Sequence, residues 1–389
     1  MSDNSTLVLF GAKGNLSRIK LIPGLFHLDE AGKLPEEMKI LSVGRQSVSQ
    51  EDWVKTIKNM LDEKFNNQYD QKVFERFIKR NIYHANLPDD PNAFKKFSEL
   101  LLNDDRFPKN LAFFLSVRPS DFALIVDQLA EEKLLNEDQY WRRVLIEKPF
   151  GTDLESAIEL QASISKHLKE TQIYRIDHYL GKSALQNILW TRFSNSIFEH
   201  MWNNEHIDHI QITNHETLGV GERTQFYDAT GALRDMTQSH LLQMLALTTM
   251  EKPKSFSPDD IRIEKIKLLK SIRPIPADNI ENFAFRAQYK SGVIEKEGEV
   301  KGYLEELESN KSVVETYAAI KLFIDNPRWK NIPVYLRTAK RLDQSGTSIS
   351  IKFKNSNKDK KMKDSNWLVF NIQPKESTYF EIQTKVPGL

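Results

Sequence analysis

The chain has 389 residues, of which 40% are hydrophobic and 28% charged, and it contains no cysteine. This length exceeds what one hydrophobic core usually supports, so two domains are expected, and the composition excludes disordered and fibrous chains. Disulfides and thiolate metal sites are excluded as well, and a net charge of +1 gives no overall field that would favour nucleic acid or an anionic membrane.

The beginning of the chain shows no targeting or membrane signal. Its early apolar run, Leu7 to Phe10, is far too short to span a bilayer and follows Asp3 rather than a basic segment. The sequence therefore predicts a cytoplasmic protein that binds neither membrane nor nucleic acid.

In the first half of the chain, short β-rich runs alternate with longer helical patterns, which is the rhythm of βαβ units around a parallel sheet. Helix signals include Ser49 to Asp52, a capping pattern ahead of Trp53, and the stretch Asp153 to Leu168. Residues 1–178 are therefore expected to form a doubly wound, Rossmann-like α/β domain. The expected strands are Thr6 to Phe10, Lys39 to Val43, Asn81 to His84, Leu111 to Ser116, Arg143 to Ile146 and Gln172 to Ile176.

The first expected strand runs directly into Gly11-Ala-Lys-Gly-Asn-Leu16 and then into a helical pattern. Two glycines in a tight turn beside a helix N-terminus suit a pyrophosphate, although this pair alone fits an ordinary strand-to-helix turn equally well. After the second strand, where an NAD-binding fold usually offers an acid, this chain has Arg45, which favours the 2′-phosphate of NADP. NADP is the expected cofactor, with NAD as the alternative.

Two polar segments follow the last two expected strands of this half, at the sheet edge where open α/β sheets bind ligands. The first is Glu147-Lys-Pro-Phe-Gly151, and the second, Arg175 to Lys182, gathers an acid, an imidazole, a phenol and an ammonium within six residues. The last three could donate to a phosphate monoester, and the acid could orient a catalytic imidazole from elsewhere in the chain. These four residues are Asp177, His178, Tyr179 and Lys182.

Beyond Leu180 the pattern changes to a long helical stretch, Gly231 to Met250, followed by several β-rich runs. Consecutive strands without helices between them indicate an antiparallel sheet, so residues 179–389 are expected to form an α+β domain. His240 lies in the helical stretch and is the candidate partner of Asp177, although a histidine in an amphipathic helix is more often part of the core. The expected strands are Phe283 to Tyr289, Val313 to Ile324, Ser348 to Phe353, Trp367 to Ile372 and Tyr379 to Gln383.

Two other polar segments of this half are expected to lie at the surface. The lysine-rich stretch Asn355 to Asn366 fits a solvated hairpin loop better than an anion site. The nine histidines show no metal-ligand spacing apart from His206-Ile-Asp-His209. No metal site is therefore predicted.

A series of motifs, taken in order, resembles the glucose-6-phosphate dehydrogenase family. Gly11 to Pro23 resembles its nucleotide fingerprint, Glu147 to Gly151 its Glu-Lys-Pro-Phe-Gly turn, and Arg175 to Lys182 its specific Arg-Ile-Asp-His-Tyr-Leu-Gly-Lys signature. The resemblance continues nearly to the end of the chain through Glu216 to Gly219, Gly231 to Gln243, Arg328-Trp329 and Tyr335 to Lys340.

The resemblance implies an enzyme that oxidises β-D-glucose 6-phosphate to 6-phosphoglucono-1,5-lactone with hydride transfer to NADP, the first step of the oxidative pentose phosphate pathway. His240 would be the general base, oriented by Asp177. The resemblance also implies a homodimer or homotetramer formed through the second-domain sheet. The cofactor residues would be Gly11, Gly14, Asn15, Leu16, Arg45 and Lys148, and the substrate residues Lys20, Lys148, His178, Tyr179, Lys182, Glu216, Asp235 and Lys340.

The sequence departs from the family pattern at several positions. Lys13 replaces a serine and adds bulk and charge beside the expected pyrophosphate, and Ser345 stands where a second basic sugar contact is expected. The chain also stops at Leu389, where the family continues, so the second sheet is expected to be incomplete. These departures keep open an inactive or weakly active homologue that regulates by binding a sugar phosphate or nucleotide. A dehydrogenase for another phosphorylated sugar is disfavoured, because Glu216 and Asp235 are both present.

Overall fold

The computed structural model describes residues 4–86, 90–295, 297–355 and 365–384. These form two compact units that divide between Ile176 and Asp177, two residues before the predicted boundary, so Asp177 and His178 belong to the second unit. Most of the lysine-rich stretch (356–364) and the last five residues (385–389) lie outside the described ranges. Within these ranges, no helix has the combined length and apolarity needed to cross a bilayer.

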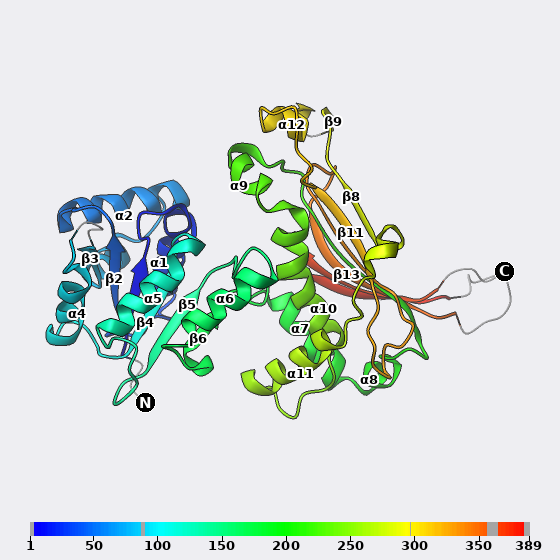
Figure 1. Cartoon of the computed structure of the whole chain (residues 1–389), viewed down its shortest axis with the longest axis horizontal. Helices are drawn as coiled ribbons and strands as arrows, with labels where there is room; N and C mark the ends of the chain where they lie inside the picture. The colour runs from blue at the N-terminus through cyan, green and yellow to red at the C-terminus, as the bar shows by residue number, and fades with distance from the viewer. Residues whose placement is uncertain (1–3, 87–89, 296, 356–364, 385–389) are drawn as a thin grey trace. The chain divides into compact units, whose positions relative to one another are not determined.

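The first unit is built on a six-stranded sheet in the order β3-β2-β1-β4-β5-β6 (Figure 1). Every neighbouring pair of its strands is parallel. All five residues of the central strand β1 are buried, as expected for a strand covered on both faces. The strands are β1 (Thr6–Phe10), β2 (Lys39–Gly44), β3 (Asn81–Ala85), β4 (Leu111–Leu115), β5 (Arg142–Ile146) and β6 (Ile173–Arg175).

Helices cover both faces of this sheet and enclose two separate cores, which confirms the predicted doubly wound domain. One core packs helices α1, α2 and α3 against Leu9 and Ile40. The other packs helices α4, α5 and α6 against Val8 and Phe113. Ser49 caps α2 by accepting from the backbone N–H of Asp52 at 3.1 Å, as the capping pattern predicts. The helices are α1 (Ile22–Glu30), α2 (Gln50–Phe65), α3 (Gln71–Lys79), α4 (Ala93–Asn103), α5 (Phe122–Glu131) and α6 (Leu154–Ile164).

The second unit contains a seven-stranded sheet in the order β15-β14-β13-β7-β12-β11-β8. Every neighbouring pair is antiparallel except the central pair β7 and β12, so the predicted mainly antiparallel sheet is confirmed. A short hairpin, β9 with β10, stands apart from it. The strands are β7 (Ile207–His215), β8 (Ala284–Ala287), β9 (Gly292–Ile294), β10 (Gly298–Val300), β11 (Tyr317–Leu322), β12 (Val334–Ala339), β13 (Gly346–Phe353), β14 (Trp367–Gln373) and β15 (Ser377–Glu381).

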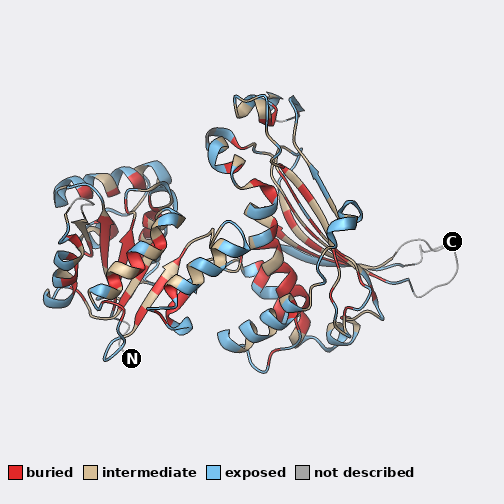
Figure 2. Cartoon of the chain, viewed as in Figure 1, coloured by how far each residue is buried: buried red, intermediate tan, exposed pale blue. Residues whose placement is uncertain are grey.

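Helices pack on one face of this sheet, and their contact forms the largest core of the unit (Figures 1 and 2). Side chains such as Leu185, Met244 and Leu268 meet Ile212 and Ile349 of the sheet there, all of them 3% exposed or less. The predicted helical stretch Gly231 to Met250 is continuous, and its first part has π-type hydrogen bonding. The helical segments are α7 (Ser183–Ser194), α8 (Ser196–Met201), α9 (Thr224–Asp228), η5 (Leu233–Leu241), α10 (Leu242–Thr249), α11 (Pro258–Lys270) and α12 (Tyr303–Glu306).

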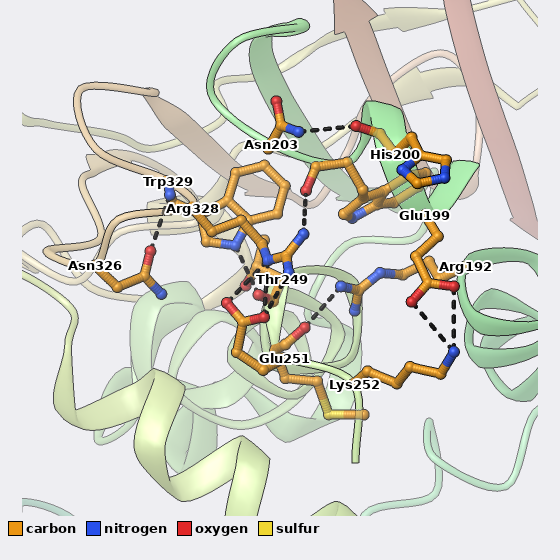
Figure 3. A network of polar contacts seen from close by, with 12 residues as sticks. Arg192, Glu199, His200, Asn203, Thr249, Glu251, Lys252, Asn326, Arg328 and Trp329 are labelled. Carbon is orange, nitrogen blue, oxygen red and sulfur yellow. Dashed lines mark hydrogen bonds and ion pairs between the residues drawn. The ribbon is translucent and has the colours of Figure 1, made fainter. Parts of the chain in front are cut away.

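The C-terminal end of α10 is held by side chains in place of a glycine cap (Figure 3). Arg192, Trp202 and Trp329 donate to its last carbonyl groups at 2.6 to 2.8 Å. Arg192 is 2% exposed, and burial lowers its pKa to about 9. A cation at this end also complements the helix dipole. The acceptors are the carbonyl oxygens of Leu247, Thr248, Thr249 and Met250.

The N-terminal end of the same helix rests on a buried carboxylate. Oε1 of Glu315 accepts from the backbone N–H of Leu233 at 2.8 Å. Gly231 precedes this contact with a φ of +75°, and a Cβ there would lie 2.6 Å from Oε1 of Glu315. A glycine is therefore required where the chain enters the helix, and η5 and α10 are fixed at both ends.

Candidate active site

His240 and Asp177 meet in the second unit. Nδ1 of His240 lies 2.7 Å from Oδ1 of Asp177, which also accepts from the backbone N–H of Tyr179 at 2.9 Å. His240 is 1% exposed. Because Nδ1 is hydrogen-bonded to a carboxylate, Nε2 is the ring nitrogen available to accept a proton from a substrate.

The surroundings of Asp177 favour its charged form. Burial acts to raise its pKa, but the hydrogen bond and charge of His240, with the Tyr179 amide and His178, together lower the pKa below the usual value. Lys265 is a further charged neighbour, from the side of α11 that packs Leu268 into the core. Burial lowers the pKa of Lys265, and the negative charge of Asp177 opposes this effect. The carboxylate is therefore suited to stabilise a protonated His240.

Aromatic and basic side chains enclose the imidazole of His240. The ring of Tyr179 stacks on it with centroids 4.3 Å apart and an interplanar angle of 24°. The ring of His178 meets it edge-on at 4.6 Å. Nζ of Lys182 lies 4.1 Å from the centroid of the Tyr179 ring. The signature segment thus places its imidazole and phenol against His240, and its ammonium against the phenol ring.

The ends of β7 and β12 add a second polar group. Glu216 follows β7, Lys340 follows β12, and the two side chains form an ion pair. Asp235 lies in η5, in the same helix as His240. Burial raises the pKa of Tyr227, and the carboxylates of Asp235 and Glu216 raise it further, so both carboxylates act on this phenol. Nζ of Lys340 lies 5.5 Å from its ring centroid.

Ser345 stands where a second basic contact to the sugar was expected, and its side chain instead forms local hydrogen bonds with Thr217. Its Oγ accepts from the backbone N–H of Thr217 at 2.8 Å and lies 3.2 Å from Oγ1 of Thr217. The serine therefore fixes the backbone just after Glu216. The side chain of Glu216 is held separately, by its ion pair with Lys340.

In the first unit, the glycine-rich turn has no room for a side chain at Gly11. Gly11 has a φ of +77°, and a Cβ there would lie 2.1 Å from the carbonyl oxygen of Ser116. The backbone N–H of Gly14 donates to the Gly11 carbonyl at 2.9 Å, and the helix begins at Asn15 and Leu16. Such a turn allows a ligand to approach the backbone closely.

The remaining predicted cofactor and substrate residues of this unit lie on its loops and helix starts. Arg45 follows β2, is largely exposed and forms an ion pair with Asp121 at 2.6 Å. Lys13 donates from Nζ to Oε1 of Gln46 at 3.0 Å. Lys20 is exposed in the first helical turns, and Lys148 follows β5, with a cis peptide bond to Pro149.

Two family models match the chain. The one described as "Glucose-6-phosphate dehydrogenase, NAD binding domain" matches residues 8–187, and "Glucose-6-phosphate dehydrogenase, C-terminal domain" matches residues 189–389. The chain belongs to the glucose-6-phosphate dehydrogenase family. The family expected from the motifs is therefore confirmed.

Individual members of this family are similar over nearly the whole chain. The glucose-6-phosphate 1-dehydrogenase of Chlamydia pneumoniae is 41% identical over 398 residues, which cover 98% of this chain and 77% of that protein. The enzyme of that name from Bacillus subtilis (strain 168) is 38% identical, covering 99% and 79%. A solved glucose-6-phosphate dehydrogenase in complex with its substrate glucose-6-phosphate is 35% identical, with a TM-score of 0.89, and covers 99% of this chain and 79% of that one.

Several residues at the site of this dehydrogenase-family chain were not predicted from the sequence. Tyr227 lies in the short helix α9, where a lone aromatic residue gives no functional signal. Lys265 occupies the core-facing stripe of α11, and a lysine there could have been noticed, because a charge rarely faces a core without a partner. Asn214, which contacts Tyr179, ends an otherwise aliphatic row of β7.

We expect Asp177 to make a pH-dependent contribution to the free energy of unfolding. Its folded pKa lies below the unfolded value of about 3.9, so the contribution is complete above that value and is lost as pH falls through the folded pKa. The difference in unfolding free energy between the natural chain and Asp177→Asn should be constant near neutral pH and shrink below about pH 4. Urea unfolding across this range measures it. A difference independent of pH would contradict the stabilised carboxylate.

Proposed function

We propose that this member of the family oxidises β-D-glucose 6-phosphate to 6-phosphoglucono-1,5-lactone, with NADP as the hydride acceptor. The observation that carries the proposal is the buried Asp177–His240 pair, a carboxylate-oriented imidazole with Nε2 available as a base. Relatives about 40% identical are named glucose-6-phosphate 1-dehydrogenase, which supports the choice of substrate and reaction.

In the proposed reaction, His240 removes the proton from the C1 hydroxyl of the sugar. The C1–H bond then breaks with its electron pair as the C1–O bond becomes a carbonyl, and Asp177 stabilises the imidazolium that forms. When bound, NADP supplies the electrophilic nicotinamide carbon that takes up the hydride. The proton and the hydride together account for the two hydrogens lost by the sugar.

The substrate contacts are proposed from the groups around His240. His178, Tyr179 and Lys182 would hold the 6-phosphate, and Glu216 and Asp235 the sugar hydroxyls. The stacking of Tyr179 on His240 and the contact of Lys182 with the Tyr179 ring support a phosphate site near the base. The positive charges proposed to assist are those of Lys20, Lys148 and Lys340.

The cofactor contacts are proposed for the first unit. The turn at Gly11 would bind the pyrophosphate, with Gly14, Asn15 and Leu16 at the helix start. Arg45 would bind the 2′-phosphate of NADP, and Lys148 would contact the cofactor as well. NAD remains the alternative acceptor.

The wider organisation is proposed on the same basis. The first unit would bind NADP, and the second unit, which begins at Asp177, would bind the sugar and mediate a homodimer or homotetramer. The sheet face opposite the helices carries partly buried side chains such as Gln211 and Thr213, which supports an interface there. A cytoplasmic location follows from the proposed metabolic role.

His240→Asn should abolish most turnover, because asparagine cannot accept the C1 hydroxyl proton. We expect kcat to fall by about 10²- to 10⁴-fold, measured by the absorbance of NADPH formed from glucose 6-phosphate and NADP. His27→Asn, at an exposed position of α1, is the matched control and should keep full activity. A folded natural chain that binds the sugar phosphate but reduces neither NADP nor NAD would instead support the regulatory-protein alternative.

Arg45→Ala should weaken NADP selectively, because the lost hydrogen bonds involve a charged phosphate that NAD lacks. We expect KM for NADP to rise about tenfold or more, and KM for NAD to change by less than about twofold. Arg106→Ala, which removes another exposed arginine paired with an aspartate, is the control. An equal rise in KM for both coenzymes would show that Arg45 does not bind the 2′-phosphate.

A further inference from the structure

The core-facing rows of three neighbouring strands change from aliphatic to polar at the same level of the sheet. Asn214 of β7 lies opposite Thr338 of the neighbouring strand β12 and opposite Thr347 of β13 on its other side. These three residues, here called the polar layer, are each 3% exposed or less. The residues two positions before Asn214 and Thr338, and two after Thr347, are Ile212, Leu336 and Ile349, all fully buried.

Asn214 links the polar layer to the signature segment. Its Nδ2 donates to Oη of Tyr179 at 2.9 Å and to Oγ1 of Thr347 at 2.8 Å. Its Oδ1 has no hydrogen-bond partner within the described ranges, so the amide is held through its NH₂ group. A buried amide donor paired in this way fixes the phenol oxygen as an acceptor.

The phenol of Tyr179 stays protonated beside the catalytic carboxylates. Burial raises its pKa, a hydrogen bond from Thr347 opposes the rise, and the charges of Glu216, Asp177 and Asp235 raise it further. Since Oη accepts from Asn214, the hydroxyl proton points away from the amide. Tyr179 is therefore a neutral donor whose orientation is set from behind by Asn214.

We propose that Asn214 is a positioning residue for phosphate recognition, directing the Tyr179 hydroxyl proton toward the 6-phosphate of the sugar. The proposal rests on the proposed function, in which Tyr179 donates to that phosphate. An aliphatic side chain at this position would remove the hydrogen bond from Asn214 that orients Oη of Tyr179. The hydroxyl proton would then no longer be directed, and phosphate binding would have to order it.

The test is a double-mutant cycle of Asn214→Leu and Tyr179→Phe, with Asn214→Thr as a second variant whose shorter side chain suits a strand. We expect Asn214→Leu to raise KM for glucose 6-phosphate about two- to tenfold and to change kcat by less than about twofold. Adding it to Tyr179→Phe should have no further effect, because both changes remove one donor. Turnover of glucose, which lacks the phosphate, should stay within about twofold of the natural chain.

Thr338→Val is the matched control, since it removes a hydroxyl from the same polar layer on the opposite side of Asn214. It should leave KM for glucose 6-phosphate unchanged. Equal losses with glucose and glucose 6-phosphate, or a full effect of Asn214→Leu in the Tyr179→Phe background, would overturn the proposal. Calorimetric titration with glucose 6-phosphate measures binding without turnover. If the natural chain is inactive, the proposed function fails. If the natural chain and Asn214→Leu bind glucose 6-phosphate with equal Kd, this inference fails.

Discussion

The hydrogen bond between Asp177 and His240 joins segments 63 residues apart in the chain, and the rest of the second unit holds them together. Asp177 opens this unit, directly after the last strand of the parallel sheet. His240 lies within a helix whose two ends are tied by Glu315 and by Arg192 with two tryptophans. In the proposed reaction His240 must reach one hydroxyl, and this constraint serves that role, because small misplacements cost large factors in rate.

The sheet contributes more than a platform for the helix. Its aliphatic rows bury the helices, and its polar layer and strand ends supply Asn214, Glu216 and Lys340 on the side of the signature segment. The same alternation of side chains that forms the core therefore also carries polar groups to the base. Phosphate recognition and proton transfer would share one supporting structure.

The sequence was sufficient for the parallel sheet and for the choice of catalytic candidates. Strands such as Thr6 to Phe10 are fully buried and therefore read as unbroken apolar runs, while the signature segment carries its chemistry in adjacent residues. The prediction for Val313 to Ile324 was too long, because Val313 is 87% exposed and Glu315 turns toward the helix N-terminus. The strand predicted at Tyr379 to Gln383 lies at Ser377–Glu381, where every residue is in the exposed class and no alternation of buried and exposed residues marks its bounds.

Other features depend on partners that are distant in sequence. The parallel pairing of the central strands β7 and β12 was not predicted, since it joins segments more than a hundred residues apart and local pattern does not encode it. The contact of Asn214 with Tyr179 and the effect of nearby carboxylates on the pKa of Tyr227 likewise arise only in the folded unit. The candidate reacting groups could thus be named from the sequence, whereas their supporting contacts required the structure.

The proposed reaction transfers hydride from C1 of glucose 6-phosphate to a nicotinamide. It is tested with glucose 6-phosphate deuterated at C1 and NADP, followed by mass spectrometry and NMR of the reduced cofactor. We expect NADPH that carries the deuterium at nicotinamide C4. Reduced cofactor without deuterium, or no reduced cofactor from a folded protein that binds both ligands, would contradict it.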